Sequence, residues 1–277
     1  MTPAVQLRTG EEPYPGYRLR RLIGRGGFAE VWAAQTADGR PVALKFLPAG
    51  NRRAISREVR ALQVVQNLHH PNLVRVERIW CHLGYIVVAM ELADGSLQDV
   101  RDVFRKDFGT PVNAELVCQF LRQAAAAIDF LNLPCSEDGE RRAAIHHGDV
   151  KPSNLLLFGD TVKLADFGLA SLKAAHAIWQ TPAGTLAYAA PEVYQGRVSD
   201  RTDQFALAVT YCELRGGRLP FPNAPPGFRR HYVPPPPDLT MLTAREVPVI
   251  ARALSPMPAD RWPSCTEMMD RLSQVVG

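Results

Sequence analysis

The first third of the chain consists of short segments in which apolar and polar residues alternate. Alternation with a period of two is typical of half-buried strands, and glycine-containing turns separate several of these segments. One stretch has helical spacing instead: Ile55, Val59, Leu62 and Val65 recur every three or four residues, and we expect a helix over 54–67. The sequence predicts five strands, at residues 17–23, 30–35, 41–47, 73–81 and 85–92.

The rest of the chain has the longer period that is typical of amphipathic helices. Helices are expected at residues 114–133, 203–215 and 247–254. A strand-rich part followed by a helix-rich part is typical of the α+β class, and 277 residues suit two lobes. We therefore divide the chain into a loose leader, a β-rich N-lobe, a helical C-lobe and a short tail, at residues 1–16, 17–91, 92–272 and 273–277.

Composition and charge narrow the class of protein. Hydrophobic residues make up 46% of the chain and charged residues 22%, which is ordinary for a globular protein. The net charge of +4 is scattered, whereas a nucleic-acid binder concentrates Lys and Arg on one stripe, so we expect no nucleic-acid partner. The five cysteines form no CxxC pair, and no apolar run reaches the roughly 18 residues of a membrane span. We expect a cytoplasmic protein, or the cytoplasmic part of a longer, membrane-anchored one.

A glycine-rich loop joins the first two predicted strands. Because glycine has no Cβ, such a loop can close over phosphate groups and point its N–H groups at their oxygens. A dinucleotide-binding fold would place these glycines between a strand and a helix, and a Walker loop would end in Gly-Lys-Ser/Thr, which is absent here. The loop and its flanks consist of Ile23, Gly24, Arg25, Gly26, Gly27, Phe28, Ala29, Glu30 and Val31.

A lysine lies within the third predicted strand, where its neighbours are apolar. A buried ammonium group without a partner is costly, so Lys45 needs a carboxylate, and Glu58 in the following helix can supply one. Held in this way, Lys45 can contact the α- and β-phosphates of a nucleotide.

Carboxylates and an amide then follow at short intervals. Asp149 and Asn154 lie on a loop that leads into an apolar segment, and Asp166 begins an Asp-Phe-Gly triplet 12 residues after Asn154. Phosphoryl transfer needs a carboxylate to orient the attacking hydroxyl and accept its proton, and Asp149 can do this. Asn154 and Asp166 can supply oxygen ligands for Mg²⁺, and Lys151 can neutralise the transferring phosphoryl group.

A further Glu ends the segment that follows Asp166. Glu192 lies in an Ala-Pro-Glu triplet, and Arg261 lies far downstream. We expect an ion pair between Arg261 and Glu192 to fix the end of this segment.

The order of these motifs resembles that of the eukaryotic-type (Hanks-type) serine/threonine protein kinases, including their bacterial members, over nearly the whole chain. The resemblance implies a bilobal protein-kinase-like fold with ATP and Mg²⁺ in its cleft, Mn²⁺ being an alternative metal. It implies transfer of the γ-phosphate to Ser or Thr of a protein substrate, with Asp149 as the base and Asp203 bracing its loop. Besides the glycine-rich loop, it implies that ATP contacts Ala43, Lys45, Met90, Glu91, Leu92 and Leu156.

Three features depart from the family pattern. The third glycine of the loop is Ala29, an insertion lies at 133–144, and Gly148 stands where the family usually has Arg. That arginine normally receives a phosphate on the activation segment. Because it is missing, we hypothesise that activity does not depend on phosphorylation of this segment, whose candidate residues are Ser171, Thr181 and Thr185; the last resembles the family's substrate-facing threonine.

Two other functions stay open, and so does dimerisation. The His-Gly-Asp triplet also resembles small-molecule phosphotransferases of the kinase fold, although these usually lack Lys at position 151 and the Ala-Pro-Glu triplet. A pseudokinase scaffold would lack a polar catalytic residue, whereas Lys45, Glu58, Asp149, Asn154 and Asp166 are all present. We interpret the pairs His69-His70 and His146-His147 as structural histidines and not as metal ligands.

Overall fold

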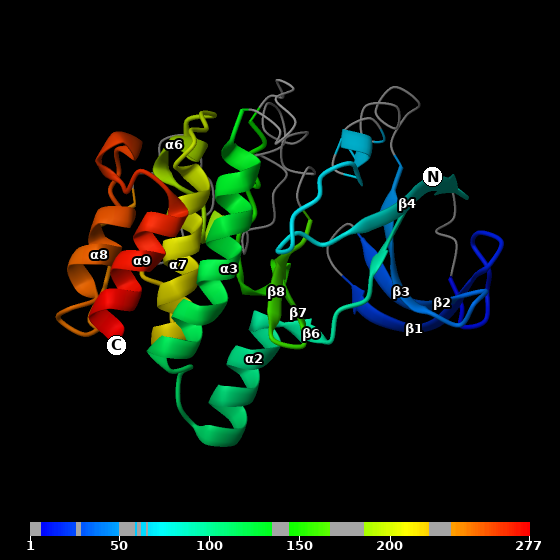
Figure 1. Ribbon diagram of the computed structural model, residues 1–277, viewed down its shortest axis with the longest axis horizontal. Helices are drawn as coiled ribbons and strands as arrows, with labels where there is room; N and C mark the ends of the chain where they lie inside the picture. The colour runs from blue at the N-terminus through cyan, green and yellow to red at the C-terminus, as the bar shows by residue number, and fades with distance from the viewer. Residues whose placement is uncertain are drawn as a thin grey trace. The chain divides into compact units, whose positions relative to one another are not determined.

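A computed structural model describes residues 7–25, 29–49, 59, 62–64, 66–134, 144–166, 186–221 and 234–277 of the chain (Figure 1). The chain divides into two compact units, which are described separately below. The first consists of Met1–His69 and Val74–Ala93, and the second of His70–Leu73 and Asp94–Gly277. No helix in the described ranges is both long and apolar enough to cross a membrane.

The first unit is built on an antiparallel sheet of five strands, in the order β1-β2-β3-β5-β4. All five predicted strands are present. Of the helix predicted over 54–67, Val59, 62–64, Gln66 and Asn67 lie in the described part; all of these are helical except Asn67, which lies in a turn. The strands are β1 (Tyr17–Arg25), β2 (Glu30–Thr36), β3 (Pro41–Pro48), β4 (Val76–His82) and β5 (Tyr85–Glu91).

The two faces of this sheet differ in composition because successive residues of a strand point to opposite sides. On β3, Val42, Leu44 and Phe46 belong to the apolar core, which continues onto the neighbouring strands. Ala43 and Lys45 therefore lie on the opposite face. The alternation that predicted the strand also assigns each residue to its face.

The described part of the N-terminal segment, from residue 7 on, is attached to the sheet, whereas the sequence suggested a loose leader. The N–H of Gly10 donates to the carbonyl of Leu19 on β1 at 2.8 Å. The indole of Trp80 on β4 donates to the carbonyl of Pro13 at 3.3 Å, and the ring of Trp80 packs against Tyr14. The segment thus contacts both edge strands of the sheet, through backbone hydrogen bonds of Gly10 and Pro13 and through the ring of Tyr14.

The second unit combines a small sheet with a group of helices. The sheet has the order β6-β7-β8, with β6 (Gly95–Ser96), β7 (Leu155–Phe158) and β8 (Thr161–Leu164). The α-helices are α2 (Leu97–Val103), α3 (Ala114–Asn132), α6 (Pro191–Tyr194), α7 (Thr202–Gly216), α8 (Val247–Ala253) and α9 (Cys265–Val276). A π-helix, η1 (Phe104–Phe108), and two 3-10 helices, η2 (Pro152–Asn154) and η5 (Pro258–Asp260), complete the unit.

Helix α7 is the centre of this unit, because every residue from Thr202 to Leu214 is buried. Helix α3 packs against α7 and α9, as Figure 1 shows, and buries one apolar face. Asn113 caps the start of α3 by accepting a hydrogen bond from the N–H of Leu116 at 2.8 Å. The three predicted helices are confirmed to within one residue at each end. Helix α9 reaches Val276 and so includes most of the expected tail.

Candidate active site

The loop that carries Asp149 is held by a buried carboxylate of α7. The N–H groups of His147 and Gly148 donate to the two carboxylate oxygens of Asp203, both at 2.7 Å. Asp203 is only 1% exposed, so these hydrogen bonds are formed away from water. Because α7 is fixed in the interior of the unit, Asp203 fixes the backbone of the loop as well.

Gly148 adopts a left-handed backbone conformation, with φ of +69°. This region costs other residues roughly 1 kcal/mol or more, whereas glycine enters it freely. The conformation allows two successive N–H groups to point at one carboxylate. Backbone geometry therefore favours glycine here, independently of any role in receiving a phosphate.

The imidazole of His147 connects the loop to the strand β8. Its Nδ1 accepts the N–H of Asp149 at 3.2 Å, which leaves Nε2–H to donate to the carbonyl of Ala165 at 2.7 Å. Ala165 directly precedes Asp166, whose φ is +64°. One buried histidine thus ties together the two segments that carry Asp149 and Asp166, in agreement with the structural interpretation of this residue.

Lys151 and Asn154 converge on Asp149. The ammonium of Lys151 lies 2.8 Å from Oδ1 and 3.0 Å from Oδ2 of Asp149. The amide Nδ2 of Asn154 donates to the backbone carbonyl of Asp149 at 2.8 Å and to its Oδ2 at 3.0 Å. Since the nitrogen of this amide is used in orienting Asp149, its oxygen remains as a ligand for a cation. The carboxylate of Asp149 is 30% exposed and so can be reached by a substrate.

Several candidate nucleotide-binding residues share one face of the five-stranded sheet. Residues directly opposite each other on paired strands project to the same side. Val31 lies opposite Lys45, and Ala43 lies opposite Met90. Lys45, two residues after Ala43, is 9% exposed. Leu156 belongs to β7 in the second unit.

Other predicted residues fall outside the described ranges. They are Gly26, Gly27 and Phe28 of the glycine-rich loop, Glu58, and Ser171, Thr181 and Thr185 of the activation segment.

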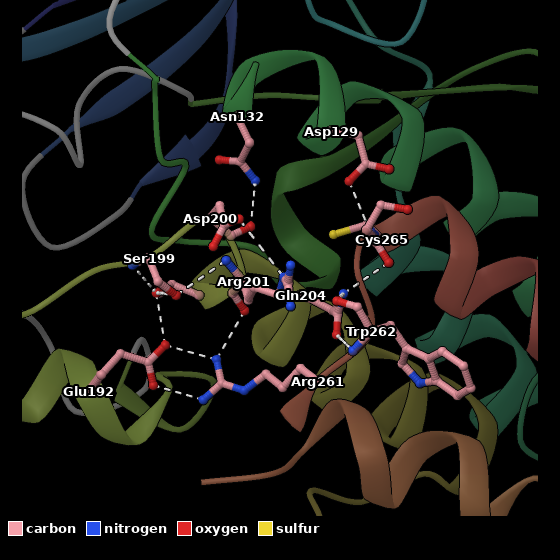
Figure 2. A network of polar contacts seen from close by, with 12 residues as sticks. Asp129, Asn132, Glu192, Ser199, Asp200, Arg201, Gln204, Arg261, Trp262 and Cys265 are labelled. Atoms are coloured by element: carbon pink, nitrogen blue, oxygen red, sulfur yellow. Dashed lines mark hydrogen bonds and ion pairs between the residues drawn. The ribbon is translucent and has the colours of Figure 1, made fainter. Parts of the chain in front are cut away.

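The end of the activation segment is fixed by the predicted ion pair (Figure 2). Arg261 donates from Nη1 and Nη2 to the two carboxylate oxygens of Glu192, both at 2.8 Å, and its side chain is fully buried. Thr202 donates a further hydrogen bond to Glu192 at 2.8 Å. Burial is the largest single effect and acts to raise the pKa of Glu192, but the pairing with Arg261, together with a backbone hydrogen bond and that from Thr202, lowers the pKa below its usual value. The contact is a buried, bidentate pair and not a surface salt bridge.

The protein kinase domain family matches residues 17–233 of this chain. The chain belongs to the protein kinase family. The expected kinase fold is confirmed, with an antiparallel β-rich unit followed by a helical one. Protein kinases act with ATP and a divalent metal ion.

Similar proteins include bacterial kinases. The serine/threonine-protein kinase PknJ of Mycobacterium tuberculosis is 32% identical over 274 residues, which cover 92% of this chain and 44% of PknJ. PknF of the same species is 31% identical, with 95% of this chain and 57% of PknF covered. The serine/threonine-protein kinase pkn3 of Myxococcus xanthus is 30% identical, covering 99% of this chain and 52% of pkn3. The chain thus spans about half the length of these relatives.

Three residues of this kinase domain that the motif analysis missed form a polar chain around one carboxylate of α7. Glu213 on α7 accepts hydrogen bonds from Tyr188 and from Arg101 on α2. The signal in the sequence was Glu213 itself, because it is a charged residue within a helix that is otherwise predominantly apolar and small. Such a residue needs partners when buried, but the sequence does not identify them.

Proposed function

We propose that this kinase domain is an ATP-dependent serine/threonine protein kinase. It transfers the γ-phosphate of Mg-ATP to hydroxyl groups of Ser and Thr in proteins. The observation that carries the proposal is the convergence of Lys151 and Asn154 on the partly exposed carboxylate of Asp149. The names of the mycobacterial and myxobacterial relatives support the choice of Ser and Thr as acceptors.

In this proposal Asp149 orients the attacking hydroxyl and accepts its proton. Lys151, next to it, neutralises negative charge on the phosphoryl group as it is transferred. The oxygens of Asn154 and Asp166 hold Mg²⁺, or Mn²⁺ in its place. This donor set fits, because both metals prefer hard oxygen ligands and bind through few protein groups when phosphates supply the rest.

The nucleotide is proposed to bind the residues that match the ATP-binding motifs of the family. Lys45, paired with Glu58, binds the α- and β-phosphates, and the glycine-rich loop covers them. Met90, Glu91 and Leu92 meet the adenine edge. The apolar contacts to the base come from Val31, Ala43 and Leu156, of which the first two share a sheet face with Lys45.

Control of activity is proposed to be independent of activation-segment phosphorylation. Gly148 has no side chain to receive a phosphate, and the end of the segment is already held by the buried pair of Glu192 and Arg261. Phosphorylation of Thr181 or Ser171 would therefore find no arginine at position 148 to bind it.

The cellular location and the partners of the domain are also proposals. We propose that it acts either in the cytoplasm or as the cytoplasmic catalytic domain of a longer, membrane-anchored protein. The chain spans about half of each relative named above, which is compatible with either setting. Its partners are ATP and a protein substrate.

The test is a phosphotransfer assay with labelled ATP and Mg²⁺. The chain is incubated with a generic basic protein and, separately, with a panel of small-molecule hydroxyl compounds, and labelled residues are mapped by mass spectrometry. We expect label on protein Ser and Thr, and a loss of at least about 100-fold in Asp149→Asn, the size of a general-base contribution. Asp107→Asn, an exposed carboxylate on η1, is the matched control.

Other results of this assay would support one of the alternative functions. Label on small molecules alone would make the chain a small-molecule phosphotransferase. A rise in unfolding temperature with Mg-ATP but no transfer would make it a pseudokinase scaffold. Thr181→Ala is expected to keep full phosphotransfer; if it loses transfer while remaining folded, control does depend on the activation segment.

A further inference from the structure

The second unit contains a cavity of about 600 Å³ that is separate from the loop of Asp149. It is formed where four helices begin or end: the start of α3, the end of α7, the residues ahead of α8 and the end of α9 (Figure 1). Arg215 lines it from the end of α7. Asp203, which holds the loop of Asp149, lies roughly three turns earlier on the same helix, about 18 Å along its axis.

A buried carboxylate orients Arg215 at the wall of this cavity. Glu246 is only 1% exposed and accepts the Nε–H of Arg215 at 3.1 Å, the N–H of Thr243 at 2.8 Å and the hydroxyl of Tyr211. Arg215 uses only its Nε in this contact, and its two Nη groups donate no hydrogen bond within the described part of the chain. Their N–H groups are therefore available to an acceptor in the cavity.

A second guanidinium group lines the same cavity. Arg245 is exposed and makes no hydrogen bond or ion pair with any residue that the structure describes. At the start of α3, Asn113 accepts the N–H of Leu116, but the N–H groups of Ala114 and Glu115 have no acceptor within the helix. Two arginines and the start of a 19-residue helix thus line one space, and all of them favour a negatively charged group there.

The other lining residues restrict the charge and the shape of a ligand. Glu246 already offsets the charge of Arg215, and Glu115 adds a negative charge at the surface. A group with one negative charge suits this balance better than a phosphate group, which carries nearly two at neutral pH. Val275 and Val276 supply apolar surface from α9. The volume lies within the range of small-molecule sites, roughly 300–1,000 Å³.

We propose that this cavity is a binding site for a small organic carboxylate with an apolar body. The carboxylate accepts hydrogen bonds from the Nη groups of Arg215 and from Arg245, and the apolar body lies against Val275 and Val276. Glu246 is a positioning residue, because it holds Arg215 without using its Nη groups. The site is additional to those for ATP and the protein substrate, and ligand binding there does not depend on phosphotransfer.

The test uses three probes that share one apolar body: 4-phenylbutyrate, the neutral 4-phenylbutyramide and 3-phenylpropyl phosphate. Their dissociation constants are measured at pH 7 by saturation-transfer NMR for the wild type, Arg245→Met and Arg218→Met. Arg218 is the matched control, because it lies just after α7, pairs with Asp238 and does not line the cavity. Its variant removes one positive charge from the same unit and leaves the site intact.

The wild type should bind 4-phenylbutyrate about tenfold or more tightly than the amide, because hydrogen bonds between two ionised groups are stronger than those to a neutral acceptor. It should bind the phosphate more weakly than the carboxylate. Arg245→Met should bind the carboxylate about tenfold more weakly and the amide unchanged, whereas Arg218→Met should match the wild type within about twofold. Ala244→Trp, which adds a large side chain to the cavity wall, should weaken binding of both acid and amide. Saturating Mg-ATP should change none of these values.

Several results would overturn the proposal. They are no saturable binding of 4-phenylbutyrate to the wild type, equal affinities for acid and amide, equal losses in Arg245→Met and Arg218→Met, or tighter binding of the phosphate, which would make the ligand class wrong. Competition by Mg-ATP would place the probe in the nucleotide site and would also overturn it. If Arg245→Met does not fold, Arg245→Gln gives the same comparison. Because no phosphotransfer is measured, failure of the proposed kinase function would leave these affinities and their interpretation unchanged.

Discussion

Two residues other than glycine have a positive φ in the described ranges, Leu83 at +45° and Asp166 at +64°. Asp166 lies at the candidate active site, where a strained backbone commonly accompanies function. Leu83 lies in the two-residue turn between β4 and β5, followed by Gly84 at φ of +82°, and is 62% exposed. Because Leu83 is largely exposed, its side chain gains little from burial to offset this strain.

Replacing Leu83 with Asn should therefore stabilise the first unit. Asn-Gly suits a turn in which both central residues have positive φ, and the left-handed conformation costs Leu roughly 1–2 kcal/mol. We expect a gain of about 1 kcal/mol in the free energy of unfolding, measured with urea. Leu83→Ala is the matched control, because it removes the exposed side chain but keeps the backbone penalty. Equal stabilisation by both changes would mean that the apolar side chain, and not the turn, was responsible.

For single residues, the sequence predicted which residues belong to the candidate site better than it predicted the structural role of each. Spacing alone singled out Asp149, Lys151 and Asn154, which the fold brings together. For Gly148 the sequence suggested only a missing phosphate receptor. The second reason, a φ of +69° that directs two N–H groups at Asp203, depends on a residue more than fifty positions away, and no local pattern encodes that.

Among the elements, helix α9 shows how one helix is capped by another (Figure 2). Asp129 of α3 accepts the N–H groups of Cys265 and Thr266, both at 2.8 Å, while Ser264 accepts that of Glu267 at 3.0 Å. The first N–H groups of a helix have no partner within it, so an acceptor from a neighbouring helix serves as a cap. The cap also fixes where α9 begins relative to α3.

Asp129→Ala should lower the free energy of unfolding by about 1–2 kcal/mol, because two N–H groups lose their acceptors. Asp270→Ala is the control. It breaks a salt bridge between Asp270 of α9 and Arg122 of α3, but both side chains are exposed, by 41% and 56%, so we expect at most about 0.5 kcal/mol. Thermal and urea unfolding of both variants would check this. Equal costs would show that the capping bonds add nothing beyond a surface contact.

Helices and strands with a regular spacing of apolar residues were predictable from the sequence, whereas segments held by tertiary contacts were not. Helices α3, α7 and α8 and all five strands of the first unit followed from apolar spacing. The attachment of residues 7–14 depends on Trp80, which is far away in the sequence. The π-helix η1 gives no periodic signal over its five residues, and so the sequence could not indicate it.

At the scale of the whole molecule, the pair of Glu192 and Arg261 should control how stability depends on pH. The folded-state pKa of Glu192 lies below the usual 4.5, so its contribution is fully present above pH 4.5 and is lost as the pH falls through the lowered value. In Arg261→Met, burial acts on Glu192 without the opposing cation, and its folded-state pKa should rise above 4.5. In the variant, the contribution of Glu192 to stability should then be greatest below pH 4.5 and be lost as the pH rises through the new value.

The free energies of unfolding of the wild type and of Arg261→Met should therefore diverge as the pH increases. At pH 7 Arg261→Met should be less stable by roughly 3–5 kcal/mol, the cost of breaking a buried pair, and the gap should narrow towards pH 4. The difference in stability is measured by urea unfolding from pH 4 to pH 7.5, with tryptophan fluorescence as the signal. Arg271→Met, whose arginine pairs with Glu267 at the surface, should track the wild type at every pH. A gap that stayed constant with pH would mean that Arg261 acts through packing, against Phe205 for example, and not through the charge of Glu192.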